Sequence, residues 1–526
     1  MSADGNFRIS SRVMNLGDFL VQAAARHPNR PAIIRDGASL TWSELNARVD
    51  AAAWSLKELG VEKGDKIVVQ SRNCFEMFET MFVAFKLGAV WVPTNYRISP
   101  SDVSHVASAS EAKIIIYDEI FPEHADAAIA VGVSHVVCIG RPREGELSYA
   151  ELSQSAGAKK FESVEVDYNH PCWFFFTSGT TGKPKAAVLS HGQMAFVITN
   201  HIADLMPGLD DDDSSLVVAP LSHGAGVHQL IQVARCVPTI LLKSDKLVAE
   251  EVFRLIDQHK ISNMFTVPTI LNALTTDPAI ERFDLTSLRH VIYAGAPMLR
   301  EHQKHALKKL GNCIVQYFGL GEVTGNITIL PRKEHSTSDQ EMKLGSCGYA
   351  RTGMKIEIQD VNGQALPPHE TGEICVIGPA VFSGYYKNDE ANAAAFRNGW
   401  FCTGDLGHLD ENGYLFITGR ASDMFISGGS NIYPLEIEES IAAHPNIVEA
   451  CVVGMPDEKW GEIGVAAVSL KDDSKLDYEQ LKAFLKPKIA SYKIPKRLVV
   501  FDVMPKSGYG KITKKIVRAA IEKRDA

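Results

Sequence analysis

Residues 173–191 read WFFFTSGTTGKPKAAVLSH, and this stretch decides both the fold around it and its chemistry. Its first four residues are apolar and predict a short buried strand. The following loop, 177–185, combines hydroxyl side chains, glycines and two lysines. Glycines let backbone N–H groups close around phosphate oxygens, hydroxyls donate further hydrogen bonds, and lysines supply positive charge. The stretch therefore predicts a strand that ends in a polyphosphate-binding loop.

The spacing of this loop differs from that of the common phosphate-binding loop, G-x-x-x-x-G-K. Here the pattern is G-x-x-G-K, from Gly179 to Lys183. The full string instead resembles the signature loop of the adenylate-forming enzymes, which include acyl-CoA synthetases, luciferases and adenylation domains of peptide synthetases. In that family the loop holds the β- and γ-phosphates of ATP. The resemblance implies a catalytic role for Lys183 and ATP binding by Thr177, Ser178, Gly179, Thr180, Thr181, Gly182 and Lys185.

Length and composition fit a protein of several domains. The chain has 526 residues, of which 45% are hydrophobic and 22% charged, and a formal net charge of −9. An acidic balance argues against nucleic acid as a partner, because nucleic-acid-binding proteins present basic surfaces. The nine cysteines are spread singly and show no zinc-site spacing, which is typical of reduced thiols. Neither a signal peptide nor an apolar run long enough to span a bilayer is recognisable, so we expect a cytoplasmic protein with no integral membrane segment.

The alternation of apolar runs and amphipathic stretches predicts an α/β fold with largely parallel sheets. Expected strands are 66–70, 113–117, 135–139, 215–219, 290–294 and 313–317, and expected helices include 41–59 and 247–259. After about residue 346, closely spaced strands and Asn-Gly turns predict a small antiparallel region. A small α+β domain follows, with helices near 434–443 and 478–486 and strands near 449–454 and 464–470. The run of aspartates at 210–213 is expected to form a solvated loop.

Further motifs of the family follow in order along the chain. The turn 293–297, YAGAP, resembles the adenine-binding turn and implies roles for Gly295, Ala296 and Pro297. The string 316–322, QYFGLGE, resembles the aromatic-Gly-x-Thr-Glu motif, in which the aromatic residue lies against adenine and the glutamate helps to coordinate Mg²⁺. This implies ATP contacts for Tyr317, Phe318 and Gly319, and metal coordination by Glu322 with Thr177. The chain departs from the pattern at Gly321, where threonine is usual.

Two more motifs resemble the ribose site and the hinge of the family. In 399–405, GWFCTGD, Asp405 is expected to accept hydrogen bonds from both ribose hydroxyls, and Arg420 to contact ribose or phosphate. The resemblance divides the chain into an adenylate-forming domain, 1–420, and a mobile C-terminal domain, 421–526. It places the pivot at Ser422, where aspartate or lysine is usual, and the pantetheine tunnel at Gly428 and Gly429.

A last motif lies near the C-terminus. In 505–512, PKSGYGKI, Lys511 matches the catalytic lysine of the family's mobile domain.

The acid-binding segment carries the weakest sequence signal. Residues 220–228, PLSHGAGVH, resemble the family segment that borders the acid, with His223 at its frequent histidine position and in a catalytic or gating role. Acyl-pocket candidates are His223, Gly224, Ala225, Gly226 and Leu320. No arginine in the sequence stands out as a partner for a second carboxylate, so we expect a medium-chain or aromatic monocarboxylate. His228 is expected to be a structural histidine.

Together the motifs predict an ATP-dependent acyl-CoA synthetase that uses ATP, Mg²⁺ and coenzyme A. A carboxylic acid and ATP would give acyl-AMP and pyrophosphate, and the thiol of coenzyme A would then displace AMP. Alternatives are an adenylate-former with a carrier-protein acceptor, a luciferase-like oxygenase and a non-catalytic nucleotide or acyl sensor. No phosphopantetheine-serine motif of a carrier domain is present. The sequence leaves open the oligomeric state, for which a homodimer is one expectation, and regulation by acylation of Lys511.

Overall fold

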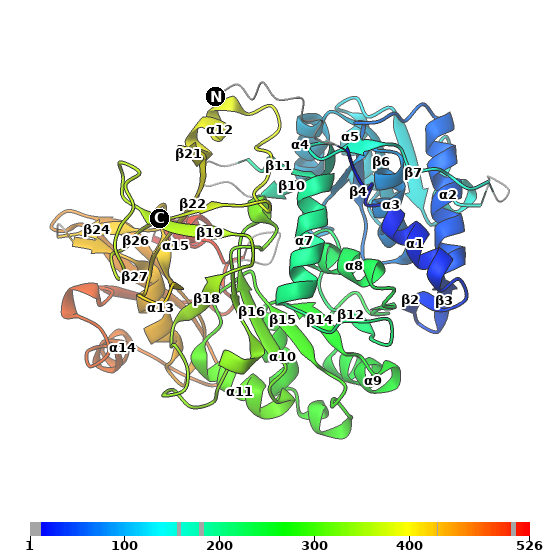
Figure 1. Cartoon of the computed structure of the whole chain (residues 1–526). Coiled ribbons are helices and arrows are strands. Elements are labelled where there is room, and N and C mark those ends of the chain that lie inside the picture. The colour runs from blue at the N-terminus through cyan, green and yellow to red at the C-terminus, as the bar shows by residue number, and fades with distance from the viewer. Residues whose placement is uncertain (1–11, 155–158, 178–182, 429, 507–511, 526) are drawn as a thin grey trace, which may run out of the picture.

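The computed structural model describes residues 12–154, 159–177, 183–428, 430–506 and 512–525. Two large sheets with helices packed around them form most of the molecule, and a smaller sheet carries the C-terminal residues (Figure 1). The expected α/β architecture, with an antiparallel region and a small α+β C-terminal part, is confirmed.

The first sheet contains the strand that precedes the phosphate loop. Its order is β11 (Lys185–Ser190), β10 (Pro171–Thr177), β5 (Val90–Pro93), β4 (Lys66–Gln70), β6 (Ala112–Asp118), β7 (His135–Ile139) and β8 (Leu147–Ser148). Neighbouring strands are parallel except β10 and β11, which are antiparallel and flank the loop. Associated helices are α1 (Asp18–Arg26), α2 (Trp42–Glu58), α3 (Phe75–Lys86), α4 (Pro100–Ser110), α5 (Pro122–Ile129) and α6 (Tyr149–Leu152).

The second sheet joins a parallel half to an antiparallel half. The parallel half is β2 (Pro31–Arg35), β13 (Thr239–Leu241), β12 (Ser215–Val217), β14 (Asn263–Thr266), β15 (His290–Tyr293) and β16 (Ile314–Phe318), with β3 (Ala38–Thr41) at its edge. The antiparallel half is β17 (Thr328–Leu330), β18 (Ser346–Ala350), β23 (Tyr414–Arg420), β22 (Trp400–Leu409), β20 (Gly372–Ile377) and β19 (Lys355–Gln359), with β21 (Phe396–Arg397) beside β22. The short strands β1 (Arg12–Val13) and β9 (Val166–Asp167) pair separately.

Helix α7 (His191–Asp204) lies between the two sheets, beside α8 (Gly224–Ala234) (Figure 1). A capping box fixes its start, since Ser190 accepts from the backbone of Gln193 while the Gln193 side chain accepts from the backbone of Ser190. One continuous hydrophobic core includes α3, α7, α8 and both sheets. The other face of the parallel half is covered by α9 (Ala249–His259), α10 (Pro268–Thr276) and α11 (Arg300–Leu310).

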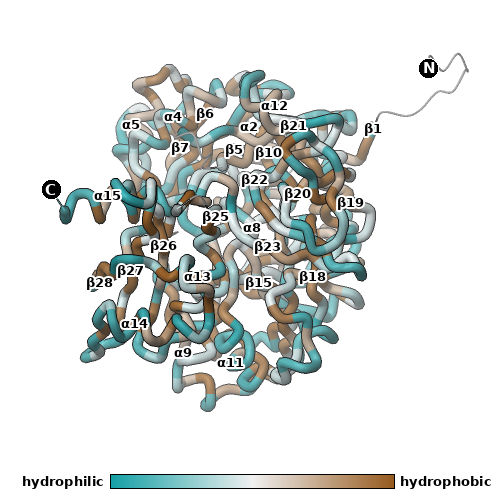
Figure 2. Tube along the Cα trace, turned by 90° about the vertical axis from the view of Figure 1, so that its left-hand side faces the viewer, coloured by the Kyte–Doolittle hydropathy of each residue, from teal (hydrophilic) through white to brown (hydrophobic). Residues whose placement is uncertain are grey.

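The C-terminal residues build a core of their own. Strands β24 (Phe425–Ser427), β25 (Ser430–Ile432), β26 (Ile447–Asp457), β27 (Gly461–Leu470) and β28 (Arg497–Val500) form a sheet with α13 (Pro434–Ala442), α14 (Tyr478–Leu485) and α15 (Lys514–Asp525). These elements gather at one side of the molecule (Figure 2). Two hydrophobic clusters here contain only residues from 425 onward. Such a separate core is what an independently moving unit requires.

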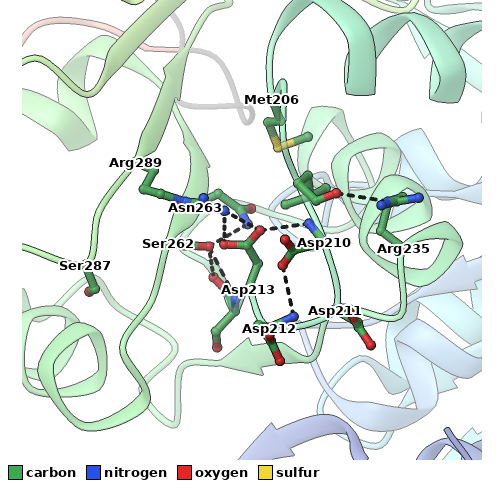
Figure 3. Close-up of polar contacts among 12 residues, drawn as sticks. Met206, Asp210, Asp211, Asp212, Asp213, Arg235, Ser262, Asn263, Ser287 and Arg289 are labelled. Atoms are coloured by element: carbon green, nitrogen blue, oxygen red, sulfur yellow. Dashed lines mark hydrogen bonds and ion pairs between the residues drawn. The ribbon is translucent and has the colours of Figure 1, made fainter.

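The aspartate run at 210–213 is not the solvated loop that the sequence predicted. Asp213 is buried and forms an ion pair with Arg289, while its Oδ2 accepts from the backbone N–H of Asp210 at 2.9 Å (Figure 3). Asp211 pairs with Arg30 at 3.1 Å, and Asp212 is exposed. Two of the four aspartates are therefore tied to distant segments, Asp213 to the residue before β15 and Asp211 to Arg30 before β2. Charge density alone did not reveal this, because the cationic partners are far away in sequence.

Two further sequence expectations can be compared with the described part of the chain. Within it, no helix is both long and apolar enough to cross a bilayer. All nine cysteines are free, and all but Cys402 are buried.

Candidate active site

Three distant segments meet at Glu322. This residue lies on η2 (Gly321–Val323), a turn of 3₁₀ helix just after β16, and its side chain is buried. The hydroxyl of Thr177, at the end of β10, donates to Glu322 Oε1 at 2.8 Å, and the hydroxyl of Tyr385 donates to the same oxygen at 2.9 Å. Among the described residues Glu322 forms no ion pair with a side-chain cation. A buried carboxylate that has hydroxyl donors and only the more distant Arg420 as a cationic neighbour suits a bound cation.

The segment that carries Tyr385 is held from two sides. Its backbone pairs with β11, where Ser383 N–H donates to Val188 O at 3.0 Å and Tyr386 N–H donates to Ala186 O at 2.9 Å. The N–H of Phe382 donates to Glu322 O at 2.8 Å. Backbone hydrogen bonds to β11 and to Glu322 thus position Tyr385, whose hydroxyl reaches Glu322. The sequence analysis did not include Tyr385, although the string SGYYK at 383–387 marks a turn with two aromatic residues.

The departure at Gly321 has a steric explanation. A Cβ atom at this position would lie 2.6 Å from Phe175 Cδ1 and 3.0 Å from Thr177 Cγ2. Threonine could not be accommodated without moving Phe175, whose ring packs edge-on against His223 at 5.4 Å. Phe175 thus fills the space beside the glutamate. The nearby Thr324 is buried, has φ of 48° and leaves its hydroxyl without a hydrogen-bond partner in the described structure.

Asp405 and Arg420 face each other across β22 and β23. They are register partners, and Arg420 Nε donates to Asp405 Oδ1 at 2.8 Å. Asp405 is buried, whereas half of the Arg420 side chain is exposed. Burial raises the pKa of Asp405, and the neighbouring guanidinium opposes this shift. The pair presents a carboxylate and a cation at one site, as contacts with sugar and phosphate require.

Of the two lysines of the phosphate loop, Lys185 lies beside Tyr385. Lys185 Nζ is 5.4 Å from the centre of the Tyr385 ring, and Lys183 is exposed. The Nε2–H of His105 donates to Pro184 O at 2.9 Å, which anchors the loop's second end to α4. Ser178, Gly179, Thr180, Thr181 and Gly182 lie outside the described residues. We use "phosphate end" for Thr177, Lys185, Glu322, Tyr385, Asp405 and Arg420.

The expected adenine-binding turn follows β15. Gly295, Ala296 and Pro297 are exposed, and Gly295 has φ of 85°, which favours glycine. Phe318, the last residue of β16, and Gly319, which follows it, are half-buried. The structure therefore separates the two aromatic candidates, because Tyr317 is buried and points into an aromatic stack.

That stack borders the expected acyl segment. The Tyr317 ring stacks on those of Phe265 and His228, each at 6.0 Å between centroids, and Phe265 and His228 are 4.6 Å apart. A Cβ at Gly224 would lie 2.8 Å from Phe265 and 3.6 Å from the Tyr317 hydroxyl oxygen, so only glycine allows this approach. We use "acyl end" for Gly224, Phe265, Tyr317, His228 and His201.

Other acyl candidates lie around this stack. His223 immediately precedes α8, and its Nδ1 lies 2.9 Å from Ser222 Oγ. Ala225 is buried, and Leu320 is half-buried just before Glu322. A Cβ at Gly226 would lie 2.1 Å from Leu221 O, so this glycine serves close packing of α8.

The candidates for hinge and CoA binding are only partly described. Ser422 is exposed, and its hydroxyl donates to Asp423 Oδ1 at 3.4 Å. Gly428 has φ of 57°, and a Cβ there would lie 2.7 Å from the Trp460 ring, so both conformation and space require glycine. Gly429 and Lys511 lie outside the described residues.

One side-chain cluster was not expected from the scattered cysteines. Glu373, Cys375 and Cys402 place potential ligand atoms within 4.8 Å of one another on β20 and β22. Burial raises the pKa of Cys375 to about 12 and also raises that of Cys402. Arg397 donates to Glu373 Oε2 at 3.1 Å and to Cys375 Sγ at 3.6 Å. Protonated thiols beside a guanidinium do not favour a metal ion.

Comparison with known proteins identifies the family. Residues 20–386 match the family model described as "AMP-binding enzyme", and residues 436–511 match "AMP-binding enzyme C-terminal domain". A feruloyl-CoA synthase from Amycolatopsis sp is 33% identical over 96% of this chain and 99% of its own. An indoleacetate–CoA ligase from Aromatoleum aromaticum is 32% identical over 97% of this chain and 99% of its own.

Solved structures agree with this assignment. The o-succinylbenzoate CoA synthetase of Bacillus subtilis, in complex with its acyl-adenylate intermediate, superposes with a TM-score of 0.84 at 29% identity, covering 98% of this chain and 99% of its own. MatB from Rhodopseudomonas palustris, bound to ATP, gives a TM-score of 0.86 at 27% identity, covering 98% of this chain and all of its own. The chain belongs to the AMP-binding enzyme family of the adenylate-forming superfamily, as an AMP-forming acid–thiol ligase.

Proposed function

We propose that this enzyme is an acyl-CoA synthetase that activates an aromatic or medium-chain monocarboxylic acid. The proposal rests on the contacts of Thr177 and Tyr385 with Glu322. These contacts form a buried anionic site beside Thr177, the residue at which the phosphate loop begins. The acid and ATP give acyl-AMP and pyrophosphate, and the thiol of coenzyme A then attacks the acyl carbon and releases AMP.

ATP is assigned to the phosphate end and the adenine-binding turn. The loop 177–185 binds the β- and γ-phosphates, Asp405 accepts from the ribose hydroxyls, and Arg420 contacts ribose or phosphate. Adenine lies between the 295–297 turn and Phe318. We assign Tyr317, which the sequence motif included in the ATP site, to the acyl end, because its ring stacks with Phe265 and His228.

Glu322 and Thr177 would hold Mg²⁺. Their side-chain oxygens are 2.8 Å apart, and the carboxylate has no ion-pair partner among the described residues. Hard oxygen ligands are the ones that Mg²⁺ prefers. When bound, the ion would neutralise charge on the phosphates.

The first half-reaction needs no general base. A carboxylic acid with a pKa of about 4 is ionised at neutral pH and can attack the α-phosphorus directly. The barrier is largely electrostatic, because an anion approaches a polyanion and pyrophosphate leaves with additional charge. Lys183, Lys185 and Lys511 supply positive charge for this step. His223, edge-on to Phe175, borders the acid.

The second half-reaction requires access for a thiol. We assign residues 1–420 to the adenylate-forming domain and 421–526 to a mobile domain that rotates at Ser422. The separate core of the C-terminal residues supports this division. Lys511 leaves the site when the domain rotates, and Gly428 and Gly429 then border the pantetheine arm.

The choice of acid follows from the acyl end. Its aromatic stack of Phe265, Tyr317 and His228 favours a flat or apolar acyl group. Relatives named for feruloyl-CoA and indoleacetate support an aromatic acid. A carrier-protein acceptor, oxygenase chemistry and a sensor role are disfavoured alternatives.

The test is release of pyrophosphate from ATP and Mg²⁺ across a panel of acids, each with and without coenzyme A. The panel spans acetate, fatty acids of increasing length, benzoates, cinnamates and dicarboxylates. Multiple turnovers that require coenzyme A with aromatic or medium-chain acids would support the proposal. A single equivalent of pyrophosphate irrespective of coenzyme A would indicate another acceptor. ATP binding without turnover across the panel would contradict it.

A further inference from the structure

Two buried histidines at the acyl end have unsatisfied nitrogens. His201 on α7 and His228 on α8 lie with ring centroids 5.0 Å apart, edge to face, where these helices run side by side (Figure 1). His201 is 0% exposed and His228 is 2% exposed. The Nε2 atom of each ring has no hydrogen-bond partner in the part of the chain that the structure describes. Leaving such groups unpaired in a protein interior is unfavourable, so a polar group bound where two of them meet would be stabilised.

The hydrogen bonds of His201 determine which proton it carries. Its Nδ1 lies 2.9 Å from Val197 O, and a carbonyl can only accept, so Nδ1 bears the hydrogen. Arg351 Nη2 lies 3.3 Å from the same Nδ1 atom. Because both atoms are then donors, this contact is not a hydrogen bond. Burial and the nearby guanidinium keep the pKa of His201 well below its usual value. In the neutral ring, Nε2 is a bare acceptor that requires a donor.

His228 complements this acceptor. Burial lowers its pKa to about 3, so the ring is neutral and its Nε2 either donates or accepts according to the tautomer. A hydroxyl group can donate one hydrogen bond and accept others. It donates its one hydrogen to His201 Nε2 and accepts from His228 Nε2–H, so it satisfies both nitrogens when His228 adopts the Nε2–H tautomer.

The local charge favours a neutral group over a second carboxylate. Arg351 is buried, and its Nη1 donates to Asn326 Oδ1 at 2.6 Å. Its Nε lies 3.6 Å from Asp204 Oδ2, so the guanidinium already has a counter-ion. The Asp204 carboxylate is itself held by Thr352 N–H at 2.9 Å. A further anion would have to be buried without a cation of its own.

Along α8 the histidine pair lies beyond Gly224, whereas His223, just before the helix, packs against Phe175 beside Gly321. His228 is four residues after Gly224 on α8, which corresponds to about 6 Å along the helix axis. Its ring stacks on Phe265, which in turn contacts the Gly224 position. A group bound at His228 would therefore lie about one helical turn beyond Gly224.

We propose that His201 and His228 recognise a hydroxyl group at the end of the acid remote from its carboxylate. This inference rests on the proposed acyl-CoA synthetase function and specifies its substrate class as a hydroxylated aromatic or ω-hydroxylated acid. The hydroxyl donates to His201 Nε2, and His228 Nε2 completes its hydrogen bonding. An acid without the hydroxyl leaves these nitrogens unpaired.

The experiment compares acids that differ only in this hydroxyl. Three pairs are 4-hydroxybenzoate and benzoate, 4-hydroxycinnamate and cinnamate, and 8-hydroxyoctanoate and octanoate. The kcat/KM for pyrophosphate release is measured with coenzyme A for the wild type and for His228→Phe. In at least one pair, we expect the wild type to prefer the hydroxylated acid by about tenfold to a hundredfold. His228→Phe should reduce that ratio to near one, and His228→Gln, which retains a hydrogen-bonding amide, should restore part of it.

His290→Phe is the matched control. His290 is also buried, and both of its ring nitrogens also lack partners in the described structure, but it lies at the start of β15 outside the acyl end. We expect this variant to keep the wild-type ratio. Thermal unfolding verifies that each variant is folded.

Calorimetry measures the affinity of the enzyme for each acid of a pair in the absence of ATP. This tests the hydroxyl site even where no turnover occurs. A preference in binding that His228→Phe removes supports the hydroxyl site independently of catalysis. The inference is wrong if the wild type binds and uses the acids of every pair equally, or if His228→Phe retains the wild-type ratio. Failure of the proposed function is recognised separately, by hydroxyl-dependent binding without pyrophosphate release.

Discussion

The phosphate end and the acyl end of the site differ in how their polar groups are satisfied. At the phosphate end, Glu322 accepts two hydroxyl donors and Asp405 pairs with Arg420. At the acyl end, His201 and His228 each retain an unpartnered nitrogen in the described structure. Polar groups that already have partners within the protein suit a reaction step that is common to every acid. Polar groups without partners instead distinguish among acids, because only some acids can bond to them. Variants at the phosphate end should therefore slow all acids alike, and variants at the acyl end should change their order.

The largest effect is expected for Lys511→Ala. Removal of one strong positive donor to the developing phosphoryl charge should slow adenylation about a hundredfold to a thousandfold for every acid. Thioester formation from supplied acyl-adenylate should persist, because Lys511 is absent from that step. Single-turnover measurements of the two half-reactions check this. Comparable losses in both would contradict the proposed domain rotation.

Glu322→Gln should slow adenylation about a hundredfold, because the amide keeps the shape but removes the charge that would hold Mg²⁺. The factor should be the same for all acids that are turned over. Tyr385→Phe is the control, since it removes one hydroxyl donor to Glu322 and leaves the carboxylate; its loss should stay below about tenfold. A changed order of acids in Glu322→Gln would break the distinction between the two ends.

Asp405→Asn should raise the KM for ATP about tenfold, with a smaller effect on kcat. The substitution keeps an acceptor for ribose but removes the counter-charge of Arg420. Initial rates at varied ATP concentration with a fixed acid measure this effect. An unchanged KM for ATP would remove Asp405 from the nucleotide site.

The smallest effect is expected where the two ends meet. Gly321→Thr restores the usual family residue, but its Cβ would press on Phe175, so it should destabilise the fold by about 1–3 kcal/mol. Thermal unfolding measures this cost. In a Phe175→Ala background, the same substitution should cost less, because the obstructing ring is gone. An equal cost in both backgrounds would show that Phe175 is not the obstacle.

Regular elements followed closely from sequence patterns. The predicted strands 66–70 and 135–139 coincide with β4 and β7, and the predicted helix 41–59 contains α2. These elements are buried on regular faces, so hydrophobic periodicity reports them directly. The aspartate run was misjudged because the burial of Asp213 depends on Arg289, which lies in a different element.

Site residues were predicted where a local string resembles a family motif, as at Glu322, Asp405 and the phosphate loop, and these roles stay predictions. Partners contributed by distant segments were missed. Tyr385 reaches Glu322 from 63 positions away, and Arg351 reaches His201 from 150 positions away. His228 was expected to be a structural histidine, and only its unpartnered nitrogen beside His201 gives it a proposed role.

The sequence by itself determined the α/β class and the family, because periodicity and short motifs are encoded within short stretches of chain, and it predicted the residues for the adenylation chemistry. The tertiary structure alone decided why Gly321 replaces the usual threonine and how Tyr385 reaches Glu322. It also decided which histidine nitrogens lack partners. Such features depend on how distant side chains fill one volume and satisfy one another's hydrogen bonds, and no local pattern specifies that.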